Sequence, residues 1–162
     1  MNLVTIIAIV IALLGSALIA GIFFAFSSFV MKALARVPSA EGIAAMQSIN
    51  VVVLNPTFLG TFMGTAAISL LVAVIAVKGW EMPSAPWLVA GASLYLVGTF
   101  LLTGLGNVPL NTQLAAVQAN DPAAIKVWEH YLGRWTLLNS VRTVAAMCAA
   151  LLFTVGLIQH GN

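Results

Sequence analysis

Five polar residues lie beside or within long apolar stretches of this chain. They are four asparagines and one arginine, namely Asn55, Asn107, Asn111, Asn139 and Arg142. Polar groups at bilayer depth cost free energy unless they are paired or used in function. An arginine beside amides can bind an anion or stabilise a negative charge that develops on oxygen during a reaction. We therefore take Arg142, Asn139, Asn107 and Asn111 as candidate catalytic residues and Asn55 as a candidate ligand contact.

The spacing of these residues gathers them on common helix faces. Asn107 and Asn111 are four residues apart, so their amides point the same way if the backbone is helical. At about 100° per residue, an arc of about 80° on one helix holds three aromatic residues, an amide and a guanidinium. These residues are Trp128, Tyr131, Trp135, Asn139 and Arg142. His130 falls about 140° from Trp135, so it becomes an acid or base at this site only if Gly133 breaks the helix.

Aromatic residues gather at the same level of the predicted bundle. Phe23, Phe26 and Phe29 end one apolar stretch, and Phe58 and Phe62 begin the next. With Trp135 they can line a flat apolar slot whose mouth carries the amides and Arg142, as in small-molecule sites. The candidate substrate-binding residues are Trp135, Tyr131, Trp128, Asn55, Phe26, Phe58 and Phe62. In the alternative, the phenylalanines face lipid, tryptophan marks the membrane interface and Arg142 extends to lipid headgroups.

Composition indicates which elements position these side chains. The chain of 162 residues is 62% apolar and only 6% charged, and its mean hydropathy is +1.09. Charge-poor stretches at residues 3–30, 56–77, 86–106 and 135–158 each exceed the roughly 20 residues that cross a bilayer as helix. We predict one all-α domain over residues 1–162, an integral membrane four-helix bundle. Two short interfacial helices are expected in its long connections, one from Ser39 to about Asn50 and one starting at Asn120.

The distribution of basic residues predicts the orientation. The two long connections hold Lys32, Arg36, Lys126 and Arg134, whereas the short loop on the other side holds Lys78. Basic residues favour the cytoplasmic side. We therefore expect a multi-pass protein of the cell membrane with the long connections in the cytoplasm and both termini outside.

Residue types argue against several kinds of site. Cys148 is the single cysteine, so an internal disulfide and a Cys-x-x-Cys motif are excluded. His130 and His160 lie outside the predicted spans, which hold no Asp or Glu, so we expect no cofactor and no metal. A basic patch with interleaved aromatics is missing from the sequence, so nucleic acid is not an expected partner. The expected partners are the lipid bilayer and a small aromatic or quinone-like ligand.

Small residues recur at helical spacing in two predicted spans. Gly60 and Gly64 are one turn apart, and Ala17, Gly21 and Ala25 form a stripe on the first span. Such residues let helix backbones approach closely. We expect these faces to pack either within the monomer or between copies in a homo-oligomer.

Five short motifs together resemble the anthrone-oxygenase-like family of small four-span membrane proteins. They are Phe-Ser-Ser-Phe-Val-Met-x-Ala-Leu at 26–34, Ala-Met-Gln-Ser-Ile-Asn at 45–50, Leu-Asn-Pro at 54–56, Asn-Val-Pro-Leu-Asn at 107–111 and Arg-Trp-Thr-x-x-Asn-x-x-Arg at 134–142. The likeness covers nearly the whole chain in order. It implies an enzyme that converts an anthrone to an anthraquinone with molecular oxygen, without a metal or flavin.

The residues are compatible with the chemistry that this resemblance implies. Arg142 can stabilise an enolate and a developing peroxide, the amides of Asn107, Asn111 and Asn139 can donate hydrogen bonds, and Trp135 can stack on the rings. The base is open between Tyr131, His130 and a water molecule. Two interpretations remain, a cofactor-independent oxygenase of anthrone- or quinone-like substrates bound at the inner-leaflet end of the bundle, and a non-catalytic membrane protein that binds a small apolar molecule or serves as an assembly partner.

Overall fold

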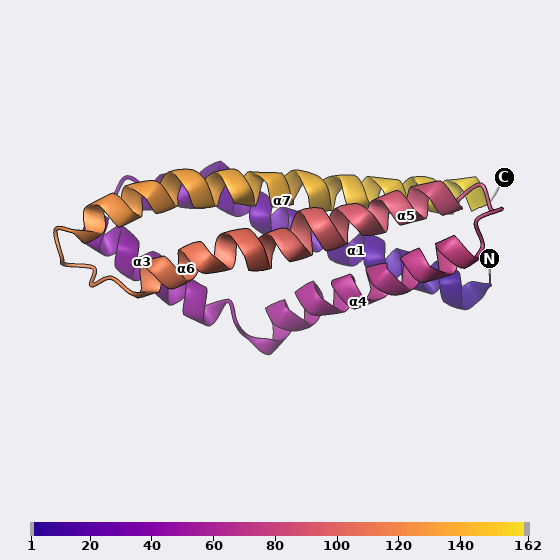
Figure 1. Ribbon diagram of the computed structural model, residues 1–162, viewed down its shortest axis with the longest axis horizontal. Coiled ribbons are helices and arrows are strands. Elements are labelled where there is room, and N and C mark those ends of the chain that lie inside the picture. Colours follow the sequence, from indigo (N-terminus) through magenta and orange to yellow (C-terminus); the bar gives the residue numbers. More distant parts are fainter. Residues whose placement is uncertain (1, 161–162) are drawn as a thin grey trace.

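The computed structural model describes residues 2–160, which form helices joined by short turns (Figure 1). Within this range, four helices are long and apolar enough to cross a membrane, and no strand is present. They are Leu3–Leu34, Pro56–Lys78, Ala85–Ala115 and Ala124–Gln159. The predicted all-helical membrane bundle is confirmed.

The four long helices contain both α-helical and π-helical segments. The first consists of α1 (Leu3–Ala25), the π-helical segment η1 (Phe26–Val30) and α2 (Met31–Leu34). A turn leads to the short helix α3 (Ser39–Val52) and then to α4 (Pro56–Lys78). The third consists of α5 (Ala85–Ser93), the π-helical segments η2 (Leu94–Leu101) and η3 (Thr103–Asn107), and α6 (Val108–Ala115). The fourth is α7 (Ala124–His160).

The bundle has two distinct ends (Figure 1). Both chain termini lie at one end, which we call the terminal end, and α3, α6 and the start of α7 lie at the other, which we call the connection end. Helix α1 packs on α4 and α7, and α5 packs on the same two helices. Helices α3 and α4 meet at a corner near the middle of the long axis, so α3 covers the connection half and α4 the terminal half (Figure 1).

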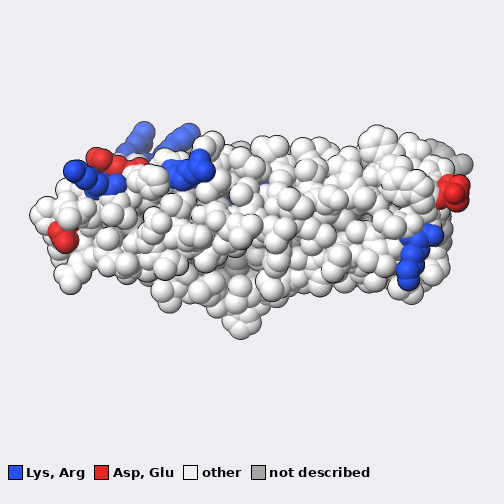
Figure 2. All heavy atoms as spheres, in the orientation of Figure 1, with Lys and Arg blue, Asp and Glu red and all other residues white. Residues whose placement is uncertain are grey.

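Charged side chains gather at both ends, and the surface between them is almost entirely uncharged (Figure 2). Helix α7 has 37 residues and is therefore about 55 Å long, whereas the hydrocarbon core of a bilayer is about 30 Å thick. We place the uncharged band in that core. The connection end, with Lys126 and Arg134 exposed on α7, then extends into the headgroups and beyond.

One of the two expected short helices is a separate element. Helix α3 runs from Ser39 to Val52, close to its predicted bounds. The segment after Asn120 instead forms the beginning of α7, which continues through Gly133 without a break. A single glycine costs a helix about 1 kcal/mol, which is too little to end one whose buried face continues on both sides.

The three glycines singled out from the sequence do not mediate close helix contacts inside the monomer. A methyl group added to Gly21, Gly60 or Gly64 would meet nothing within 4 Å, so the first of the two expected kinds of packing does not apply to them. Close approaches occur elsewhere, because a methyl group on Gly15 would overlap the Thr65 hydroxyl and hold α1 away from α4. Spacing alone does not show which face of an apolar helix meets its neighbour. A contact between two copies stays a prediction.

Candidate functional site

The π-helical segments bring polar groups from two helices to Arg142. Ser27 of η1 accepts a hydrogen bond from Asn139, Thr99 of η2 donates to the Arg142 carbonyl, and Thr103 of η3 accepts from the Arg142 guanidinium. The η3 segment ends two residues before Pro109, which has no backbone N–H and cannot continue the regular ladder. π-Helical turns are often found at functional sites.

Arg142 lies inside the bundle, with only 3% of its surface exposed. Its Nη1 donates to the Thr103 hydroxyl at 2.9 Å and its Nη2 donates to Asn139 Oδ1 at 2.7 Å. The guanidinium carbon lies 4.0 Å from the centre of the Phe23 ring and 5.4 Å from that of Trp135. The interior placement excludes the alternative in which Arg142 reaches the headgroups.

The charge of Arg142 is only partly compensated. All the partners named above are neutral, and Nε is buried with no hydrogen-bond partner among residues 2–160. Removing a guanidinium from water costs several kcal/mol, and neutral partners recover only part of that free energy. An anionic group on a ligand would supply the compensation that these neutral groups do not.

Asn139 holds Arg142 in place. Its Nδ2 donates to the Phe23 carbonyl and to Ser27 Oγ, both at 2.7 Å, while its Oδ1 accepts from Arg142. Asn139 is fully buried and is not part of the cavity wall described below. Its amide therefore connects Arg142 to α1 and η1, and it does so without facing the cavity.

Asn107 and Asn111 both bond to Trp135, as expected for amides that point the same way. Asn107 Nδ2 donates to the Trp135 carbonyl at 3.2 Å, and the Trp135 indole donates to Asn111 Oδ1 at 2.8 Å. Asn111 Oδ1 also accepts from the Tyr131 hydroxyl at 2.8 Å, and that hydroxyl accepts from Asn50 of α3. The network fixes the Trp135 ring between α3 and α6.

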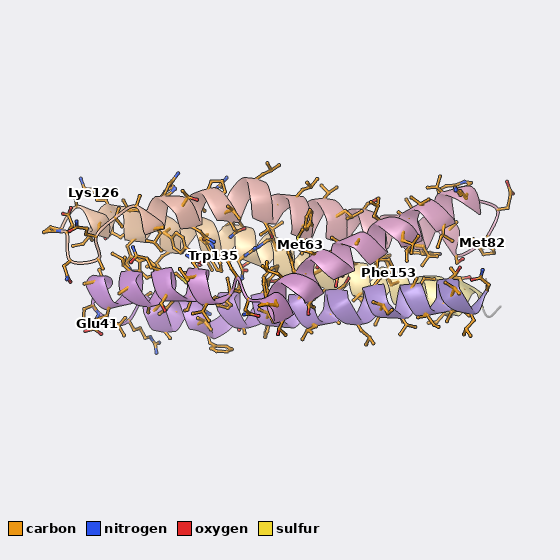
Figure 3. The ribbon with its side chains drawn as sticks, turned by 90° about the horizontal axis from the view of Figure 1, so that it is seen from below. Glu41, Met63, Met82, Lys126, Trp135 and Phe153 are labelled. Atoms are coloured by element: carbon orange, nitrogen blue, oxygen red, sulfur yellow. The ribbon has the colours of Figure 1, made fainter. Side chains whose placement is uncertain are left out.

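A cavity of about 430 Å³ lies behind the α3–α4 corner. This volume falls within the range of about 300–1,000 Å³ that small-molecule sites occupy. Its wall combines aromatic rings with several polar groups. The aromatic residues are Phe23, Phe26, Phe58, Phe62 and Trp135, and the polar ones are Gln47, Asn50, Thr103, Asn107, Asn111, Thr112 and Arg142. Figure 3 shows Trp135 and Met63, which both belong to the wall, in the middle part of the long axis.

The cavity reaches the surface on its lipid-facing side. Val51, Leu54 and Met63 belong to its wall and are 73%, 64% and 52% exposed. These residues belong to the α3–α4 corner and the first turns of α4, which are part of the uncharged surface. An apolar molecule dissolved in the bilayer would meet this opening.

Several predicted site residues lie outside the cavity wall. Trp128 stacks on Tyr131, and Tyr131 stacks on Trp135 with ring centres 5.8 Å apart, so the first two belong to the packed connection half of the core. Asn55, expected as a ligand contact, lies outside the wall and caps α4 by accepting from the Phe58 amide. His130 is exposed on the face of α7 opposite the buried stripe.

Thr103 is a site residue that sequence reasoning missed. Thr99, Thr103, Asn107 and Asn111 recur every fourth residue along the third span, and this polar stripe within an apolar segment was the available signal. No group of three or more His, Cys, Asp or Glu side chains that could hold a metal ion occurs in the described part of the chain.

Comparison with known proteins identifies the family. The family described as anthrone oxygenase matches residues 56–152, more than half of the chain. The chain belongs to the anthrone oxygenase family. No curated protein and no solved structure matches it. The matched region of this anthrone oxygenase family member contains the polar stripe of the third span and Arg142, whereas α1, η1 and α3 precede it.

Proposed function

We propose that the protein binds a flat aromatic ketone of the anthrone type in this cavity and promotes its oxidation by molecular oxygen to a quinone. The observation that carries the proposal is Arg142, a buried cation in the wall of an aromatic cavity with only neutral described partners. The enolate of such a ketone carries its negative charge on one oxygen. Arg142 would stabilise that oxygen more strongly in the enolate than in the neutral ketone, as catalysis requires.

The reaction needs no oxidant other than oxygen itself. Loss of a proton from the central CH₂ group gives the enolate, and a carbon–oxygen bond then forms between that carbon and O₂ to give a hydroperoxide after protonation. The hydroperoxide loses its remaining C–H proton while the O–O bond breaks. The products are the quinone and one water molecule, so the substrate gains one oxygen atom and loses two hydrogen atoms.

The cavity wall suggests which residues serve each step. Trp135 and Phe62 present flat surfaces on which the fused rings can stack, and the Asn111 amide lies beside them. The wall contains no histidine and no carboxylate, so we assign the proton acceptor to water. By stabilising the enolate, Arg142 lets such a weak base suffice. Trp128 and Tyr131 support the Trp135 ring from behind the wall.

The lack of a histidine or carboxylate in the cavity wall favours a second candidate function, which is binding without catalysis. A site without a histidine or carboxylate can bind an aromatic or quinone-like molecule from the bilayer without transforming it. In that case Arg142 would hold a ligand oxygen with no turnover. In either case we infer from the basic residues of the connection end that the cavity opens toward the cytoplasmic half of the membrane.

Product formation distinguishes the two functions. Membranes that contain the wild-type protein, Arg142→Ala or Arg134→Ala are supplied with anthrone, and quinone absorbance and oxygen consumption are followed. Arg134 is an exposed arginine eight residues before Arg142 on the same helix, so it is the matched control. We expect wild type and Arg134→Ala to exceed spontaneous oxidation, and Arg142→Ala to match it. Wild-type rates equal to those of membranes without the protein would overturn the oxygenase proposal.

A further inference from the structure

Asn107 presents an unpaired hydrogen-bond acceptor at the cavity. Its side chain is 1% exposed, and its Nδ2 donates to the Trp135 carbonyl at 3.2 Å. A carbonyl oxygen can only accept, so the nitrogen of the amide must face Trp135 and Oδ1 must face away from it. Oδ1 is buried and has no hydrogen-bond partner among residues 2–160. The sequence suggested Asn107 as a donor to the ligand, whereas one of its two N–H groups already donates within the protein and its oxygen has no partner in the described range.

Asn107 and the cation belong to the same cavity wall. Asn107 follows Thr103 by one helical turn, and Thr103 accepts the hydrogen bond from Arg142 Nη1 at 2.9 Å. Arg142 Nε is the other unpaired buried group of the same wall in the described range. Two residues of the wall therefore carry a free donor with positive charge and a free acceptor. A buried acceptor without a hydrogen bond costs free energy, so a ligand that does not donate to it binds less tightly than one that does.

We propose that Asn107 is a specificity-determining residue that accepts a hydrogen bond from a hydroxyl group on the ligand. The ligand class is then a phenolic aromatic ketone, whose ketone oxygen lies toward Arg142 while its hydroxyl lies toward Asn107. This inference rests on the proposed function, since it describes the ligand of the same cavity. A site built to pair a ligand hydroxyl discriminates against analogues that lack it, because the buried protein group is then left unpaired.

Binding of redox-stable quinones tests this inference without turnover. The protein in lipid nanodiscs is titrated with 2-hydroxyanthraquinone, its methyl ether and unsubstituted anthraquinone at mildly acidic pH, where the phenol keeps its proton. Quenching of tryptophan fluorescence reports binding, since Trp135 is part of the wall. We expect wild type to bind the hydroxyl compound about tenfold more tightly than the other two, as one additional hydrogen bond provides. The methyl ether tests whether the O–H donor of the ligand is needed, and unsubstituted anthraquinone tests whether the size of the substituent matters.

Two variants complete the design. Asn107→Leu should bind all three quinones alike. Thr61→Val is the matched control, because Thr61 of α4 does not belong to the wall and its hydroxyl already donates to the Thr57 carbonyl at 2.9 Å, so this variant should keep the wild-type preference.

Each outcome decides the inference. Equal binding of the three quinones by wild type would overturn it even if Asn107→Leu failed to fold, and so would an unchanged preference in a folded Asn107→Leu. A preference that disappears only in Asn107→Leu would support it, even if anthrone were never oxidised, in which case the oxygenase proposal alone would fall. Absence of all quinone binding would overturn this inference, and quinone formation from anthrone would then decide the oxygenase proposal separately.

Discussion

Replacing Arg142 with glutamine removes a buried charge from the bundle while leaving an amide that can donate to Asn139 or Thr103. The structure allows the effects on stability and on activity to be worked out separately. For stability, the variant loses one charge-assisted hydrogen bond of about 1.5–3 kcal/mol. It also loses the stacking of the cation over Phe23, worth about 1–2 kcal/mol. Against this, it avoids burying a guanidinium at bilayer depth, which costs about 3 kcal/mol on insertion scales.

These opposing terms nearly cancel, so we expect the free energy of unfolding of Arg142→Gln to lie within about 2 kcal/mol of the wild-type value. The effect on activity is expected to be much larger. Loss of one donor that stabilises a developing oxyanion lowers kcat by about 10²–10³. Removal of a ligand-binding charge is expected to change the reaction rate strongly and the free energy of unfolding only slightly.

Two measurements on the same preparation test this prediction. Denaturant unfolding of the detergent-solubilised protein, followed by circular dichroism, gives the stability, and quinone formation per folded molecule gives the rate. A loss of more than about 4 kcal/mol would show that Arg142 mainly holds the bundle together, in contrast to its partly compensated environment. A variant with the wild-type rate would refute the assignment of its charge to the reaction.

Three further predictions follow from the contacts. Asn139→Leu should lower the rate through Arg142 but leave quinone entry unchanged, which product assays and tryptophan quenching separate. Gly15→Val should destabilise the bundle by about 1–3 kcal/mol, because its side chain meets Thr65 across the α1–α4 contact, and unfolding curves measure this. A cysteine at Arg36, introduced after Cys148→Ser, should react with an impermeant thiol reagent in inverted vesicles and not in intact cells.

Each of these predictions has a control. Ser140→Ala removes a hydroxyl next to Asn139 that donates to Ser27 and to the Thr136 carbonyl, neither of which belongs to Arg142, and it should keep the wild-type rate. Gly64→Val places the same side chain on α4 where nothing lies within 4 Å, so unfolding of the monomer should be unaffected. Labelling at residue 36 from outside intact cells would reverse the proposed orientation.

The sequence predicted the spans and the buried stripe of α7 because both follow from hydropathy and helical period. Trp128, Tyr131, Trp135 and Arg142 are all buried on one face, as their spacing indicates, and His130 is exposed. Periodicity works well here because α7 is a regular α-helix over its described length.

Which residues line the cavity, and how Asn107 would bond to a ligand, could not be predicted in the same way. The π-helical segment η1 shifts the phase of the side chains that it carries, and Phe29, expected with the other aromatic residues, is 61% exposed. Whether Asn107 would donate to the ligand or accept from it depends on the Trp135 carbonyl, which belongs to another helix. Contacts between helices decide both points, and a single-sequence pattern does not contain them.

The most direct test of the account is to look for the enolate itself. Under strictly anaerobic conditions, anthrone is mixed with nanodiscs that contain the wild-type protein, Arg142→Gln or no protein, and the absorption band of the enolate is recorded. Wild type should accumulate the bound enolate at a pH where empty nanodiscs show only the neutral ketone, and admission of oxygen should convert that band to the quinone spectrum. The same band in Arg142→Gln, or its absence from wild type that binds anthrone, would contradict the central claim that Arg142 stabilises the anion.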